Sequence, residues 1–255
     1  MKLWTIKHLI TIIPSFAVMI IVAAVLRAYL LNASEAVRFI PVKISAIFII
    51  IIEIIKQIVS LCNGYDLYHL PFHFCSMFIF MIPLFAFFRG KRENHIRAFT
   101  TVISSALFLF MIIAPYYLYT DERITTAFSD FLSFHTVAFH FVAVLVFVLI
   151  IALDLYKPDT KHDLKIMAVY ITAYCAVGGT TAQIFKTNYN NFYYCAAEPV
   201  DSLRSLIAEK IGTSLGQTIY VIGVTAVTLS FTLISYIVYR LIYKAVNGSK
   251  SKKTA

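Results

Sequence analysis

The sequence has too few charged residues for an ordinary soluble protein. Asp, Glu, Lys and Arg make up 14% of its 255 residues, whereas soluble domains contain about 25%. Hydrophobic residues make up 60% of the chain, and the mean hydropathy is +0.80. This composition excludes the one or two soluble domains that the length alone would allow.

The alternation of apolar and polar residues that is typical of a membrane-spanning strand is also lacking. Only helices and closed barrels satisfy every backbone polar group in lipid, and a spanning helix needs about 20 apolar residues. The apolar runs are long and continuous, so we predict an all-α fold, a polytopic membrane helical bundle with about seven transmembrane helices. The predicted spans are Ile10–Leu31, Phe39–Cys62, Leu70–Phe88, Phe99–Tyr119, Phe134–Leu155, Leu164–Ile184 and Gln217–Tyr243.

The chain lacks an internal repeat and a clear cleavage site for a signal peptide. Its first apolar run, Leu9–Leu31, is too long for the hydrophobic region of such a peptide, so we interpret it as a retained span. A short helix is expected at Val200–Ile211, within the longest break between spans. We expect residues 1–245 to form a single transmembrane helical domain, followed by a basic disordered tail at residues 246–255.

Basic residues are few on one side of the predicted bundle and many on the other. With seven spans, the N-terminus and the loops after spans two, four and six lie on the same side of the membrane. Of the 22 Lys and Arg residues, six flank that side, Lys56 lies within a span, and the remaining 15 flank the opposite side. The positive-inside rule therefore predicts an outside N-terminus and a cytoplasmic C-terminus. Because the net charge of +9 is distributed in this way, we expect a membrane partner and no nucleic acid.

The four cysteines follow neither a metal-binding spacing nor a dense disulfide pattern. They are Cys62, Cys75, Cys175 and Cys195. Cys62 and Cys195 are both expected near the outer surface, so a disulfide between them stays open. No metal site is predicted from this pattern.

The stretch "YHLPFHFCSMF", residues 68–78, opens the third predicted span. Cys75 lies five residues inside Leu70, near the positive end of the predicted helix, where the field favours a nucleophilic thiolate. The alternative is an inert buried cysteine. His69 and His73 are four residues apart and would share a helix face, as half of a metal site or as interfacial histidines.

The segment "SFHTVAFHF" supplies a candidate base from the fifth predicted span. His140 lies six residues inside Phe134, at a depth similar to that of Cys75. A histidine in hydrocarbon usually faces the bundle interior or a wet cavity. We therefore consider His140 a candidate proton acceptor for Cys75, with a core histidine bonded to a backbone carbonyl as the alternative. His135 lies at the mouth of the same span.

Two further polar groups fall in the outer half of the predicted bundle. Glu53, Lys56 and Gln57 share one face of span two, either as a structural ion pair or with Glu53 orienting a histidine. The segment after span six carries side chains that suit an oxyanion or headgroup site or an interfacial belt. These side chains are Gln183, Asn188, Tyr189, Asn190 and Asn191. Because the charge counts place all these groups at one end, we predict a single outward-facing polar pocket.

These segments resemble motifs of the YwaF / transmembrane protein 164 family. The stretch "EIIKQIVSLCNGYDLYHLPFHFCSMF" is similar to its Glu-containing helix and its "LPLHLCS"-like motif. "FHTVAFHFVAVLVF" is similar to a later helix that contains the family's histidine, and "TNYNNFYYCAAEPVDSL" to an Asn-Tyr motif. The order and spacing of the motifs agree over residues 48–222.

The resemblance implies a multi-helix membrane protein and, in the animal branch, a lipid acyltransferase that works through a cysteine and a histidine. Carried over by motif, Cys75 matches the cysteine and His140 the histidine, with His135 as the other assignment. Asn188 and Tyr189 match the Asn-Tyr pair. The expected partner is a membrane phospholipid or lysophospholipid. Many members are microbial, so a microbial plasma membrane is expected.

Three functional hypotheses follow. In the first, Cys75 and His140 carry out covalent acyl transfer to a lysolipid, or hydrolysis when water is the acceptor, without a cofactor. The residues expected to support this site are Glu53, His73, His135, Gln183, Asn188 and Tyr189. In the second, the pocket belongs to a transporter or a receptor-like protein that binds a lipid or small molecule. In the third, histidines of spans three and five hold a metal ion.

Overall fold

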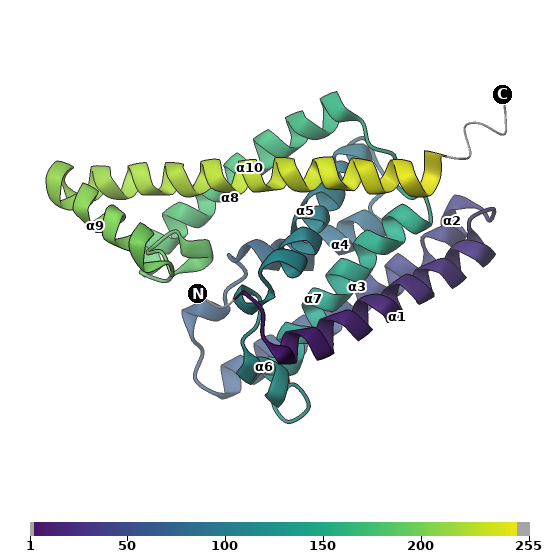
Figure 1. Cartoon of the computed structure of the whole chain (residues 1–255), viewed down its shortest axis with the longest axis horizontal. Helices are drawn as coiled ribbons and strands as arrows, with labels where there is room; N and C mark the ends of the chain where they lie inside the picture. Colours follow the sequence, from purple (N-terminus) through teal and green to yellow (C-terminus); the bar gives the residue numbers. More distant parts are fainter. Residues whose placement is uncertain (1–2, 249–255) are drawn as a thin grey trace.

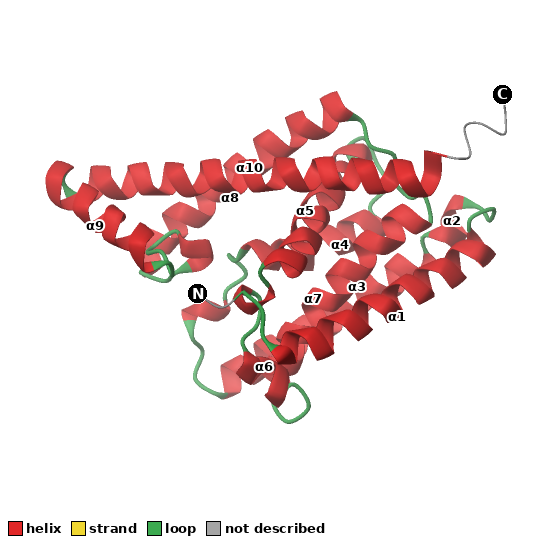
Figure 2. Ribbon diagram, viewed as in Figure 1, coloured by secondary structure: helices red, strands yellow, loops and turns green. Residues whose placement is uncertain are grey.

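The structure is a computed structural model that describes residues 3–248, and it is a bundle of α-helices (Figure 1). Within these residues it contains no strand (Figure 2), which confirms the predicted all-α fold. The α-helices are α1 (Ile6–Leu30), α2 (Glu35–Arg38), α3 (Ile40–Cys62), α4 (Met77–Phe87), α5 (Glu93–Ile113), α6 (Asp121–Thr126), α7 (Phe131–Ala152), α8 (Thr160–Phe185), α9 (Glu198–Ile211) and α10 (Thr213–Asn247). The 3-10 turns are η1 (Leu67–His69), η2 (Phe74–Ser76), η3 (Pro115–Tyr117) and η4 (Tyr189–Asn191).

Six segments of the described chain are long and apolar enough to cross a membrane. They are α1, the α2–α3 segment, α5, α7, α8 and α10. These segments correspond to six of the seven predicted spans. The short helix expected at 200–211 is also present, as α9.

The third predicted span begins too early. Its helix, α4, starts at Met77 rather than at Leu70, and its 11 residues cover about 16 Å, roughly half of a hydrocarbon core. The steric demand of Pro71 disfavours a helical conformation in the residue before it. Leu70 accordingly has an extended backbone, with φ −62° and ψ 145°, and His73 is extended as well. Cys75 therefore lies in η2, outside the α-helix.

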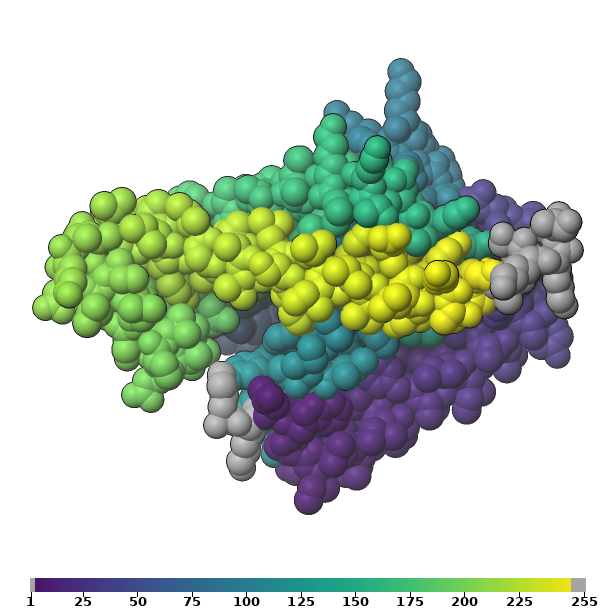
Figure 3. Space-filling view, turned by 45° about the horizontal axis from the view of Figure 1, so that its top comes forward, coloured from purple at the N-terminus to yellow at the C-terminus, as the bar shows by residue number. Residues whose placement is uncertain are grey.

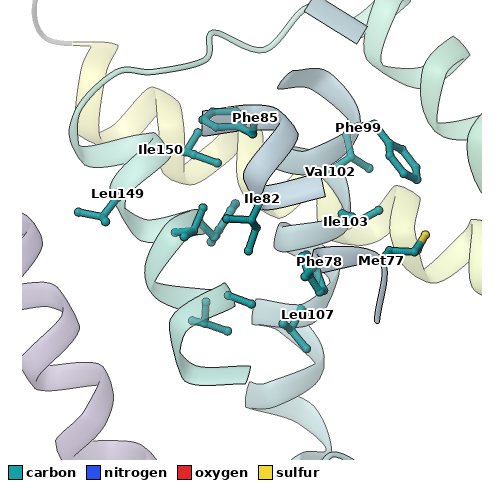
Figure 4. Packing of buried hydrophobic residues seen from close by; sticks show 14 of the residues in the cluster. Met77, Phe78, Ile82, Phe85, Phe99, Val102, Ile103, Leu107, Leu149 and Ile150 are labelled. Atoms are coloured by element: carbon teal, nitrogen blue, oxygen red, sulfur yellow. The ribbon is translucent and has the colours of Figure 1, made fainter. Parts of the chain in front are cut away.

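The short helix α4 lies inside the bundle. It packs against α3, α5 and α7, and Figure 4 shows its apolar side chains among those of α5 and α7. The side chains of Phe78, Ile82 and Phe85 are at most 1% exposed. Irregular backbone at membrane depth is tolerated where protein surrounds it, so the burial of α4 explains how a non-helical segment can precede it.

A buried carboxylate fastens α10 to the α7–α8 connection. Asp163 is fully buried and accepts hydrogen bonds from the hydroxyls of Tyr156 and Tyr236, the latter at 2.8 Å. The hydroxyl of Tyr239 donates to the backbone carbonyl of Tyr156 at 2.9 Å. Because a buried charge is costly unless it is hydrogen-bonded, this arrangement fixes the end of α10. The sequence did not reveal it.

The first long helix begins at one end of the bundle, and the last long helix finishes at the opposite end. Figure 1 shows α1 beginning at one end, here named the N-terminal end, and α10 finishing at the other, the C-terminal end. The helix α10 continues to Asn247, whose side chain donates to the carbonyl of Ile151 at 3.0 Å. It thus passes the predicted domain boundary at residue 245. The rest of the predicted disordered tail, residues 249–255, lies outside the described residues.

This arrangement gives a topological prediction. We expect reporter domains fused to the N-terminus and to the C-terminus to report opposite sides of the membrane, with the N-terminus outside, because basic residues concentrate at the other side. Alkaline phosphatase and green fluorescent protein fusions at each end measure this in a bacterial host. Identical signals from both ends would contradict an odd number of crossings.

Candidate functional site

The Cys75 turn, residues 72–76, is held by the η4 turn. Asn190 of η4 accepts a hydrogen bond at its Oδ1 atom from the backbone N–H of Phe74 at 2.6 Å. Its Nδ2 atom donates to the backbone carbonyl of Phe72 at 3.1 Å. Asn190 has a φ of 50°, a left-handed conformation that asparagine tolerates better than most residues. The side chain of Asn190 thus pairs with a backbone N–H group and a backbone carbonyl beside the cysteine.

Two tyrosines complete this support. The hydroxyl of Tyr174, on α8, donates to the carbonyl of Phe72 at 2.7 Å. The hydroxyl of Tyr189, on η4, donates to the carbonyl of Leu67 at 2.5 Å. Because buried backbone carbonyls need partners, these bonds replace the helical bonds that the segment lacks.

His73 packs within the same segment. Its Nε2 atom lies 3.1 Å from the carbonyl of Tyr68, which can only accept, so Nε2 carries the proton and Nδ1 has a free lone pair. Its ring packs edge-on against Tyr68 and Tyr189. His69 lies in the separate turn η1, so the prediction that His69 and His73 share a helix face is wrong.

A second polar cluster is centred on Glu53 of α3, which is 7% exposed. The Nζ atom of Lys56 lies 3.1 Å from Oε1 of Glu53, and Nε2 of Gln57 donates to the same oxygen at 2.7 Å. Both donors also reach the backbone carbonyl of His69, at 3.3 and 3.2 Å. The predicted Glu53–Lys56 pair is therefore confirmed, and it binds α3 to the segment that leads to the cysteine.

Glu53 also faces a histidine of α7. Its Oε2 atom lies 2.9 Å from Nε2 of His135, an ion-pair distance, although the two groups are not aligned for a hydrogen bond. Both side chains are buried, and the imidazole stacks on Phe139. The structure therefore brings Glu53 and His135 together, and the hypothesis that Glu53 orients a histidine stays a prediction.

His140 has a different environment on the same helix. Its Nδ1 atom donates to the backbone carbonyl of Thr136 at 2.6 Å, because a carbonyl can only accept. The Nε2 atom is then left with its lone pair, as a general base requires. The ring lies 6.2 Å from that of Tyr119. Within residues 3–248 no hydrogen bond joins the thiol of Cys75 to His135 or His140, so a Cys–His dyad stays a prediction.

The other predicted polar residues organise the η4 segment. Asn188 accepts at Oδ1 from the backbone N–H groups of Tyr193 and Tyr194, at 3.2 and 3.3 Å. Gln183 donates to the carbonyl of Phe192 at 2.9 Å. Asn190, rather than Asn188, reaches the Cys75 turn. The signal for Asn190 was present in the sequence, since it lies in the amide cluster, but nothing in the sequence indicated Tyr174.

The four cysteines are free thiols in the structure. Cys62 is exposed, Cys175 is buried, and Cys75 and Cys195 are intermediate. The disulfide left open between Cys62 and Cys195 is therefore not formed. Across residues 3–248, no three or more His, Cys, Asp or Glu side chains are arranged to hold a metal ion.

Two open hollows lie at the surface of the described chain. One, of about 420 Å³, is lined by Trp4, Thr5, Ile6, Lys7 and Asp121. The other, of about 630 Å³, is lined by residues of 194–209. Neither includes Cys75, Glu53 or His140. The single outward-facing pocket stays a prediction.

The comparison with known families matches residues 3–243 to the TMEM164 family. The chain belongs to the TMEM164 family. A search of curated proteins and a search of solved structures each gave no match. For this TMEM164-family protein, membership confirms the predicted resemblance and, with the apolar helices, shows an integral multi-pass membrane protein.

The geometry of the turn predicts a specific cost for losing Asn190. We expect Asn190→Ala to lower the free energy of unfolding by about 1–3 kcal/mol, because it leaves the part-buried N–H of Phe74 without its partner and removes one of the two hydrogen bonds to the carbonyl of Phe72. Unfolding in mixed detergent–SDS micelles measures this change.

Asn191→Ala is the matched control. Asn191 also has a positive φ, of 61°, but its side chain accepts only from the backbone N–H of Ala196. Both substitutions therefore carry a similar backbone penalty. An equal loss of stability in the two variants would show that the backbone, and not the bonds to the Cys75 turn, accounts for the effect.

Proposed function

We propose that this TMEM164-family protein is a membrane-embedded lipid acyltransferase with Cys75 as its nucleophile, or a lipid acyl hydrolase when water is the acceptor. The observation that carries the proposal is the built turn around Cys75. Side chains from α8 and η4 hold the backbone of Phe72 and Phe74, and these bonds fix the position of the cysteine in the turn. We further propose that the turn lies in the outer half of the membrane, since basic residues concentrate at the opposite side.

The turn has features that suit a nucleophile. Cys75 lies two residues before the first residue of α4, Met77, where the positive end of that helix favours a thiolate. Within the described residues, the N–H of Cys75 makes no bond to a backbone carbonyl outside its own turn. This N–H is therefore a donor for the oxyanion that forms when a carbonyl is attacked.

The proposed reaction has two steps and needs no cofactor. The histidine takes the proton of the Cys75 thiol, the sulfur attacks the acyl carbonyl of a phospholipid, the ester C–O bond breaks, and the lysolipid leaves with that proton from the histidine. The resulting thioester conserves the energy of the ester. An acceptor hydroxyl then gives its proton to the histidine and attacks the thioester, which releases the thiol. His140 is the first candidate for this histidine because its Nε2 lone pair is free, and His135 is the second because it lies beside Glu53.

The covalent intermediate gives the direct test. Purified protein incubated with phospholipid should gain the mass of one acyl chain, and neutral hydroxylamine should remove it because it cleaves thioesters. Intact-mass spectrometry measures both changes. Cys75→Ala should abolish the adduct, whereas Cys175→Ala, at a buried position on α8, should keep it. Full acyl transfer by the Cys75→Ala variant would end the covalent mechanism.

Histidine variants distinguish the two candidate bases. We expect His140→Ala to slow acyl transfer by about 10²-fold or more, the range of a general base. His135→Ala and Glu53→Gln should have smaller effects if Glu53 and His135 only position neighbouring groups. Rates of lysophospholipid acylation at equal protein level measure this. The reverse order would assign the base to His135.

A second function is favoured by the buried ion pair. Glu53 and Lys56 lie inside a spanning helix, and paired charges at such depth often mark a coupling or gating element of a transporter. Under this second hypothesis, the protein transports or binds a lipid or a small molecule. Retained transport or binding in Cys75→Ala, together with its loss in Glu53→Gln, would favour this function over acyl transfer.

A further inference from the structure

The helix α9 is short, and it folds back along α10. Gly212 joins the two helices with a φ of +90°, a conformation that side chains other than glycine rarely adopt. At Gly216 an added Cβ atom would lie 2.6 Å from the Cα atom of Ala208, so the helices touch backbone to backbone. None of the residues of α9 is buried, although one side of the helix is covered by α10.

The Asp201–Arg204 ion pair lies within α9, and its contacts with Cys195, Gln217 and Tyr220 orient the helix. The Nε atom of Arg204 donates to Oδ1 of Asp201 at 2.7 Å, and the guanidinium lies 5.9 Å from the ring centroid of Tyr220 on α10. The same carboxylate accepts from the backbone N–H of Cys195. These hydrogen bonds, with that of Arg204 the strongest influence, lower the pKa of Asp201 below its usual value. The pair therefore stays charged and holds one edge of the helix in place.

The remaining surface of α9 has an apolar edge and a polar edge. Val200, Leu203 and Leu206 are 46%, 57% and 50% exposed, and successive helical residues are 100° apart. On that geometry these three side chains lie within about 120° of one another. Ser205 and Glu209, both exposed, lie on the neighbouring polar edge.

The apolar edge continues onto the adjoining helices. Ile184 on α8 and Leu215, Ile219 and Ile222 on α10 are between 43% and 69% exposed. Figure 3 shows this part of the chain projecting beyond the body of the bundle. Exposed apolar side chains therefore occur on α8, on the first turns of α10 and on α9, which packs against α10.

The length of α10 supports the same conclusion. Its 35 residues extend about 52 Å, whereas a hydrocarbon core is about 30 Å thick. Its exposed apolar side chains run from Leu215 to Val246. Lipid can cover this whole row only if α10 is inclined, which brings its first turns and α9 into the membrane interface.

We propose that α9 is an interfacial helix whose apolar edge, Val200, Leu203 and Leu206, docks on the lipid surface at the side of the membrane that contains the Cys75 turn. The occupant of this edge is phospholipid, because α9 packs against α10, a spanning helix whose exposed apolar side chains lipid covers. Amphipathic helices bind membrane surfaces in this orientation. The segment that joins η4 to α9 is held by α10, since Gln217 of α10 donates to the carbonyls of Phe192 and Tyr193.

Tryptophan quenching tests the orientation of α9. The chain has a single tryptophan, so Trp4→Phe provides a background in which Leu203→Trp, Leu206→Trp or Ser205→Trp is the only emitter. The protein is reconstituted in nanodiscs of brominated or unbrominated phosphatidylcholine. We expect brominated lipid to quench Leu203→Trp and Leu206→Trp at least twofold more than Ser205→Trp, and aqueous iodide to show the reverse order.

Equal quenching at the three positions, or full access of iodide to Leu203→Trp and Leu206→Trp, would overturn the proposal. Val200→Trp and Glu209→Trp provide a second pair on the two edges if a variant of the first set fails to fold, as judged by size-exclusion chromatography. The measurement has no acyl-transfer readout. A failure here therefore leaves the proposed reaction unaffected, and loss of that reaction leaves this proposal unaffected.

Discussion

Backbone polar groups at membrane depth must find partners within the protein, and the candidate site depends on this constraint. The residues before α4 are not α-helical, with Leu70 and His73 extended, so their carbonyl and N–H groups cannot bond to one another as in a span. Partners come from elsewhere in the chain: Asn190 for Phe74 and Phe72, and Tyr174 for Phe72. The position of Cys75 is consequently set by side chains more than 90 residues away in the sequence.

The same segment links the two polar clusters of the structure. Lys56 and Gln57 bind the carbonyl of His69, whereas η4 binds the segment a few residues later. The Glu53–His135 pair and the Cys75 turn are thus attached to one stretch of backbone. A change at Glu53 would alter the charge beside His135 and also the support of this stretch. A catalytic role of Glu53 and a positioning role therefore have to be measured separately.

The two ends of the bundle differ in how their polar groups are satisfied. At the C-terminal end, Asp163 and its tyrosines form a closed network, and every partner is a side chain or backbone group of the protein. At the N-terminal end, His140 keeps a free ring nitrogen and the N–H of Cys75 lacks a backbone partner outside its turn. Unused donors and acceptors are what a binding or reacting group would require, and this is the end at which the reaction is proposed.

The sequence by itself determined the membrane fold, the number of long helices to within one, the Glu53–Lys56 pair and the family, because hydropathy, residue spacing and motif order are local properties. It did not determine where α4 begins, since the extended backbone around His73 depends on distant side chains that satisfy its neighbours. It did not identify Tyr174, or choose Asn190 over Asn188, because their roles depend on how α8 and η4 approach the Cys75 turn. The pairing of Glu53 with His135 was likewise decided by the packing of α3 against α7. Contacts between helices far apart in the chain fix the directions of these side chains, and no local pattern records those directions.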